Sequence, residues 1–150
     1  MPLVKSGVIR ESVVVKGNIE DVYDFMYDFS NAVKWDPGVL KSECIKDKTF
    51  ALTTIFNGKK SEMTYTVVSY KRPYEITLKG DGPNVRAIDT IKFSKIDNNY
   101  TKIEYEADLT LKGFRRPFIV FIGKSLKKLG EDAIEGIRKY FFYGSKHGIK

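Results

Sequence analysis

The apolar residues of this chain change their spacing near residue 115. Between residues 39 and 111 short segments rich in β-branched and aromatic residues are separated by turn residues, which is typical of consecutive strands. From Pro117 to Tyr143 the apolar residues recur every three or four positions and the charged residues fall on the opposite side, which predicts one long amphipathic helix. Such a helix must bury its apolar side, and we expect it to pack this side against the predicted sheet.

The remaining elements follow from the same patterns and from the turn residues between them. The expected strands are residues 8–16, 39–47, 49–56, 62–71, 74–80, 85–96 and 100–111; the expected helices are one that begins after Asn18, a short one at 32–35 and the long one at 117–143. In the last strand apolar residues from Ile103 to Leu111 alternate with polar ones, so one face of the sheet is buried and the other is wet. We therefore predict one α+β domain over residues 1–150. It has a curved seven-stranded antiparallel sheet, two short helices after the first strand, and a long C-terminal helix across the concave face.

Cysteine and histidine are too scarce for several kinds of site. Cys44 is the single cysteine and His147 the single histidine, so an internal disulfide and a cysteine- or histidine-rich metal centre are excluded. A Ser-His-Asp triad would need a histidine four residues from the end of the chain. We expect no metal and no cofactor. The N-terminus lacks the apolar core of a signal peptide and no apolar run reaches about 18 residues, so we expect a cytoplasmic protein.

The net charge of +7 lies in the last quarter of the chain, where residues 112–150 carry ten basic and three acidic side chains. Lys124, Lys127 and Lys128, which follow Arg115 and Arg116, would suit an anionic membrane surface. A solvated helix face with ion pairs at i, i+4 gives the same count. We expect no nucleic acid partner, because RNA recognition on a sheet needs exposed aromatic residues and here they alternate inward.

A single helix laid across a strongly curved sheet leaves a space between the two unless large side chains fill it. The sequence has ten Phe, nine Tyr and one Trp, and those that point inward could either line a cavity for an apolar ligand or fill the core. Trp35 could cover the mouth of such a cavity or pack the short helices onto the sheet. The candidate ligand-binding residues are Trp35, Tyr65, Asp89, Ile91, Phe93, Tyr105, Ala107, Leu109, Phe118, Phe121 and Ile122.

Asp89 is the one weak candidate for a catalytic residue. If Ile91 and Phe93 point inward, the two-residue period of a strand also points Asp89 and Ala87 inward. A carboxyl group in an apolar cavity has a raised pKa, as general acid or base chemistry requires. The alternative is that Asp89 lies near the mouth, in water or paired with Arg86 or a lysine.

Several segments of the chain resemble one known family. They are Val13-Val14-Val15, Ile19 to Phe29, Trp35-Asp36-Pro37-Gly38-Val39, Tyr70 to Ile76 with its Arg72-Pro73 pair, and Thr101 to Tyr105. These segments and the order of the elements are similar to those of polyketide cyclase/dehydrase and lipid-transport proteins. These proteins belong to the START-like helix-grip (SRPBCC) superfamily, together with coenzyme Q-binding proteins and the major birch pollen allergen. The resemblance implies the helix-grip fold over nearly the whole chain, and its motifs are mostly packing and turn residues.

Three functions follow as hypotheses. The first is binding or transport of a small hydrophobic ligand, such as a lipid, a quinone, a sterol or a polyketide-like molecule, in the cavity between sheet and helix. The second is an enzyme of the cyclase/dehydrase type, in which Asp89 or a tyrosine transfers protons. The third is a basic module that docks on an anionic membrane. A set of polar groups that converge inside the cavity would distinguish an enzyme from a carrier, and whether the protein is an enzyme stays open at this point.

Overall fold

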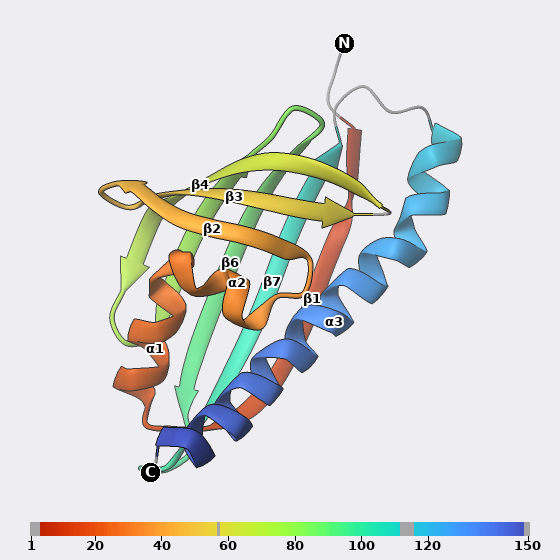
Figure 1. Ribbon diagram of the computed structural model, residues 1–150. Coiled ribbons are helices and arrows are strands. Elements are labelled where there is room, and N and C mark those ends of the chain that lie inside the picture. Colours follow the sequence, from red (N-terminus) through yellow and green to blue (C-terminus); the bar gives the residue numbers. More distant parts are fainter. Residues whose placement is uncertain (1–3, 57, 112–115, 149–150) are drawn as a thin grey trace.

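The computed structural model describes residues 4–56, 58–111 and 116–148, and the side chains at residues 7–56, 58–111 and 125–142. It contains seven strands, three α-helices and one 3₁₀ turn (Figure 1). The elements in chain order are β1 (Val4–Lys16), α1 (Ile19–Tyr27), η1 (Phe29–Asn31), α2 (Ala32–Trp35), β2 (Val39–Lys46), β3 (Thr49–Phe56), β4 (Lys59–Lys71), β5 (Glu75–Asp81), β6 (Val85–Lys95), β7 (Tyr100–Leu111) and α3 (Arg116–Gly148).

The strands form one antiparallel sheet in the order β1-β7-β6-β5-β4-β3-β2. The predicted fold class is confirmed. Two strands begin earlier than the sequence predicts, at Val4 and Lys59, because Val4 pairs with Leu111 and Lys59 pairs with Phe56. Pairing with a long neighbouring strand extends them beyond the segments that local preference marks as strand.

Helix α3 runs along β1 on the concave side of the sheet, and α1 and α2 lie on the same side (Figure 1). On its apolar face Leu126 and Ile137 are buried, whereas Phe142 points away and is exposed. Two glycines bring the backbone of α3 close to its neighbours. A Cβ atom at Gly130 would overlap Ile9 of β1, and one at Gly136 would overlap the carbonyl group of Trp35 at the end of α2.

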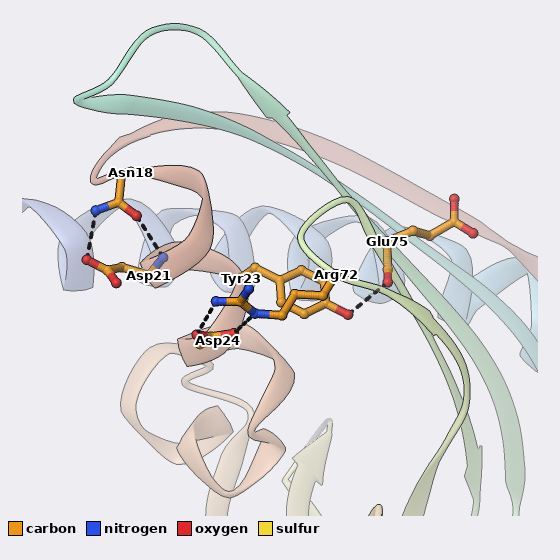
Figure 2. Close-up of polar contacts among 6 residues, drawn as sticks. All are labelled: Asn18, Asp21, Tyr23, Asp24, Arg72 and Glu75. Atoms are coloured by element: carbon orange, nitrogen blue, oxygen red, sulfur yellow. Dashed lines mark hydrogen bonds and ion pairs between the residues drawn. The ribbon is translucent and has the colours of Figure 1, made fainter.

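Helix α1 closes one end of the sheet. Asn18 caps it, since the side-chain oxygen of Asn18 accepts a hydrogen bond of 2.9 Å from the backbone N–H of Asp21. Figure 2 shows how α1 is tied to the turn between β4 and β5: Arg72 donates two hydrogen bonds to Asp24, and the hydroxyl of Tyr23 donates to the carbonyl of Glu75 at 3.2 Å. Two of the segments that carry the family resemblance are therefore in contact with each other.

Among the described residues no helix has the length and apolar content that crossing a membrane requires.

Candidate functional site

A cavity of about 100 Å³ lies between α3 and the concave face of the sheet. Its wall is mostly apolar and contains three carboxyl groups and two phenol groups. The lining residues are Ile9 and Glu11 of β1, Asp36 after α2, Tyr65 of β4, Asp89 of β6, Tyr105, Ala107 and Leu109 of β7, and Leu129, Gly130, Ala133, Ile134 and Ile137 of α3.

Small side chains on the inner face of the sheet make room for this cavity. Asp89 pairs with Ala107 on β7, Ala87 lies two residues before Asp89 on the same face, and Gly80 of β5 pairs with Ala87. The ring of Tyr65 lies over Gly80, where a Cβ atom would come within 2.5 Å of it. The inner face beside Asp89 therefore carries the small residues Gly80, Ala87 and Ala107, together with the larger Leu78, which pairs with Asp89 on β5, and Tyr105, which hydrogen-bonds it.

Asp89 is the most deeply buried polar group of the cavity, with 4% of its surface exposed. Its Oδ2 accepts a hydrogen bond of 2.5 Å from the hydroxyl of Tyr105, and its Oδ1 is buried with no hydrogen-bond partner among the described residues. Burial raises the pKa of Asp89 to about 7, against the lowering effect of the Tyr105 hydrogen bond. Arg86, three residues earlier on the same strand, belongs to the opposite face and does not pair with Asp89.

Asp36 and Glu11 bring two more carboxyl groups to the cavity. Burial raises the pKa of Asp36 to about 6, although its Oδ1 accepts a hydrogen bond of 2.8 Å from the backbone N–H of Gly38. Glu11 lies beside Gly130 of α3, where the missing side chain leaves room for it. Burial, followed by the charge of Asp89, raises the pKa of both Tyr65 and Tyr105 well above the usual range, so the two phenols are neutral at physiological pH.

Five of the predicted ligand-binding residues line the cavity, namely Tyr65, Asp89, Tyr105, Ala107 and Leu109. Trp35, Ile91 and Phe93 are buried in the core and do not line it. Trp35 packs edge-on against Phe29 and Tyr105, which is the packing role rather than a cover over the mouth. Phe118, Phe121 and Ile122 lie in the part of α3 whose side chains are outside the described residues.

The sequence analysis missed Glu11 and Asp36. Glu11 lies between Ile9 and Val13 in a strand where every second residue points inward, and this signal could have found it. Asp36 follows α2 and has no comparable pattern. Its contact with the cavity depends on the packing of α2 against Gly136 of α3, which no local spacing reveals.

The outer face of the sheet carries a larger hollow of about 520 Å³, over β1, β5, β6 and β7. Most of its lining side chains are charged or hydroxylic; among them are Arg10, Glu75, Lys92, Glu104 and Glu106. It lacks the apolar wall that a small-molecule site uses to exclude water. We therefore take the smaller, inner cavity as the candidate site.

Among the described residues no group of three or more His, Cys, Asp or Glu side chains is arranged to hold a metal ion. On α3 Lys127 and Lys128 are exposed, and Lys128 forms an i, i+4 ion pair of 3.2 Å with Asp132. The side chain of Lys124 lies outside the described residues.

Comparison with solved structures supports the fold. A START superfamily protein from Mycobacterium smegmatis has a TM-score of 0.79 at 12% identity, over 91% of this chain and 97% of that one. The Zhui aromatase/cyclase from a Streptomyces species has a TM-score of 0.76 at 12% identity, over 96% of each chain. A truncated norcoclaurine synthase from Thalictrum flavum has a TM-score of 0.66 at 16% identity, over 93% of this chain and 94% of that one. At these identities the likeness shows a shared fold.

Comparison with curated protein sequences gives no significant match. The family model described as polyketide cyclase / dehydrase and lipid transport matches residues 6–141, which is nearly the whole chain. The chain therefore belongs to the polyketide cyclase/dehydrase and lipid transport family.

Proposed function

We propose that this protein binds a small, mostly apolar molecule in the cavity between α3 and the sheet. The observation that carries the proposal is the cavity wall itself, which combines apolar residues from β1, β7 and α3 with a few convergent polar groups around Asp89. This is the usual make-up of a ligand site, in which apolar contact supplies affinity and a few polar groups fix orientation. Membership of a family that includes lipid-transport proteins supports the same function.

The size of the cavity limits what it holds in this conformation. Ligand sites commonly measure about 300–1,000 Å³, whereas this cavity measures about 100 Å³ because aromatic side chains fill much of the space. A sterol, a quinone or an acyl chain exceeds that volume, so the aromatic side chains that fill the space, or α3 itself, would have to move to admit one. A ligand that buries roughly 300 Å² would gain up to about 7 kcal/mol from apolar burial before the entropy of binding is subtracted.

Titration with Nile red, a neutral dye whose emission responds to apolar surroundings, tests the proposal. We expect saturable binding at one site and competition by candidate lipids. Tyr105→Ala should change the affinity for the dye because Tyr105 lines the cavity. Tyr100→Ala is the matched control, since Tyr100 is an exposed residue at the start of the same strand. An absence of saturable binding, or an equal effect of the two substitutions, would contradict the proposal.

A second candidate is catalysis of the cyclase/dehydrase type on a polyketide-like or aromatic substrate. The observation in its favour is a buried carboxyl group with a pKa of about 7 that has one oxygen free to exchange a proton with a bound molecule. The test is cyclisation of a short poly-β-ketone thioester with and without the protein. Catalysis predicts faster cyclisation, a pH–rate inflection near 7 and loss of the acceleration in Asp89→Asn with Nile red binding retained. If the product and the rate are the same with and without the protein, catalysis is excluded and ligand binding remains as the proposed function.

A further prediction is that the basic face of α3, which carries Lys124, Lys127 and Lys128, docks on an anionic membrane. The Lys128–Asp132 pair favours a solvated face instead, because part of the positive charge is already balanced there. Flotation with phosphatidylserine vesicles distinguishes the two. Docking predicts flotation that the reversals Lys127→Glu and Lys128→Glu abolish, whereas a solvated face predicts no flotation of the unmodified protein.

A further inference from the structure

We propose that the ligand of this cavity carries a hydrogen-bond donor, a hydroxyl or an ammonium group, that binds Asp89, and that the cavity rejects anionic ligands such as free fatty acids. This inference rests on the proposed binding function and names the chemical class of the ligand. It follows from the kinds of polar atom that the cavity presents.

One carboxyl oxygen of Asp89, Oδ1, is left without a hydrogen-bond partner among the described residues. The side chain is 4% exposed and lines the cavity, Tyr105 donates to Oδ2, and no described residue hydrogen-bonds Oδ1. When Asp89 is ionised, a buried carboxylate oxygen without a partner is costly, and a ligand that donates a hydrogen bond to it removes that cost and favours the ionised form. A purely apolar ligand would leave Oδ1 without a partner.

The described residues that line the cavity can carry negative charge but no positive charge. Glu11, Asp36 and Asp89 all line it, and among the described lining residues there is no lysine, arginine or histidine. Tyr105 already directs its hydroxyl hydrogen to Asp89. An anionic head group would therefore lie next to carboxylates with no cation among the described lining residues to balance it, in a medium where charges interact more strongly than in water.

The side chains next to Asp89 differ in size. Leu78 of β5 lies on one side of it and the small residues Ala87 and Ala107 lie on the others, so the space for a polar head group is on the side of the two alanines. The apolar wall from Leu129 to Ile137 faces it from α3 and suits the apolar body of the ligand. The expected ligand is thus an alcohol, a phenol or an amine with an apolar body.

Four naphthalene probes of nearly equal size test the inference by fluorescence titration at pH 8, above the pKa of Asp89. Naphthalene has no polar group, 2-naphthol offers a hydroxyl, 2-naphthylmethylamine offers an ammonium group and 2-naphthoate is an anion. We expect the two donor probes to bind at least about fivefold more tightly than naphthalene, as a hydrogen bond to a charged group allows, and 2-naphthoate to bind most weakly.

Two variants show whether Asp89 is responsible. Asp89→Asn removes the charge but keeps an oxygen that accepts a hydrogen bond, so it should reduce the preference for the donor probes severalfold and weaken the rejection of 2-naphthoate, to which Glu11 and Asp36 still contribute. Glu104→Gln is the matched control, because it removes one negative charge from an exposed side chain of β7 beside Tyr105, and it should leave the preference unchanged. A preference for the donor probes that is undiminished in Asp89→Asn would overturn the inference.

The probes separate failure of the inference from failure of the proposed function. If naphthalene binds as tightly as 2-naphthol, the cavity binds apolar molecules but Asp89 does not select a donor, and only the inference is overturned. If 2-naphthoate binds best, the inference is also wrong and the proposed function stands. If no probe and no Nile red binds, both are overturned.

Discussion

The two ends of the concave face use the same sheet in opposite ways. Toward α1 the inner positions carry Ile76, Ile91 and Ile103, all 0% exposed, and α1 covers them with Val22 and Met26. Toward the other end the same strands carry Gly80, Ala87, Asp89 and Ala107, and a cavity lies over them.

Under the proposed function, this contrast separates stability from ligand binding within one fold. Large aliphatic side chains pack together at the first end, and their burial stabilises the fold. At the second end small side chains and a buried carboxyl group give up part of that stabilisation. Asp89 occupies a position where a carboxyl group is costly for folding. We therefore propose that this position belongs to the ligand site.

The largest effect should come from the charge of Asp89. Burial raises its pKa from the usual 3.8 to about 7, so between these values the folded protein holds a proton that the unfolded chain releases. The free energy of unfolding therefore falls as the pH rises through this range. Asp89→Asn removes this contribution, and the variant should gain up to about 4 kcal/mol relative to the unmodified protein between pH 4 and pH 8.

Urea unfolding at a series of pH values measures this difference. Asp36, whose pKa is raised to about 6, contributes a slope of the same sign in both proteins, so the comparison removes most of its contribution. If the unfolding free energies of the two proteins depend on pH in the same way, burial does not raise the pKa of Asp89.

The next effect compares the packing of the two ends. Ile103→Ala should lower the free energy of unfolding by about 3 kcal/mol, since it leaves a new void among fully buried neighbours. Leu109→Ala should cost less, because Leu109 borders the cavity, so part of its surface faces a space that already exists. If chemical denaturation shows the same loss of unfolding free energy for both variants, the two ends do not differ in packing.

A smaller effect should come from filling space. Ala107→Leu extends a side chain into the cavity, so we expect it to change the stability by less than about 1 kcal/mol and to abolish Nile red binding. Ala32→Leu is the matched control in the packed region, where Ala32 is 1% exposed, and overpacking there should cost about 1–3 kcal/mol. Thermal unfolding of the two variants checks the order, and a greater loss in Ala107→Leu would reverse it.

The fold could be predicted from the sequence because each element carries a local signal. The alternation from Ile103 to Leu111, the cap at Asn18 and the apolar side of α3 each specify their element without knowledge of the others. The same period placed Asp89 on the inner face, and the structure confirms that placement.

The cavity could be predicted only in part. Alternation shows that Ile91, Phe93 and Tyr105 point inward, but not which of them α1 and α2 cover. That depends on where α1, α2 and α3 meet the sheet, and close approaches such as that of Gly136 to Trp35 decide it. The sequence therefore does not distinguish core residues such as Trp35, Ile91 and Phe93 from residues that line the cavity.

The central claim is that a ligand enters the open end of the concave face and not the packed end. Methyl NMR spectra recorded during titration with 2-naphthol test it most directly. The account predicts saturable shifts at Ile9, Ala107, Leu109 and Ile137, which line the cavity, and little change at Val22, Ile76 and Ile103, which lie in the packed end. Saturable shifts at the packed end, or the absence of saturable shifts at the cavity methyl groups, would contradict it.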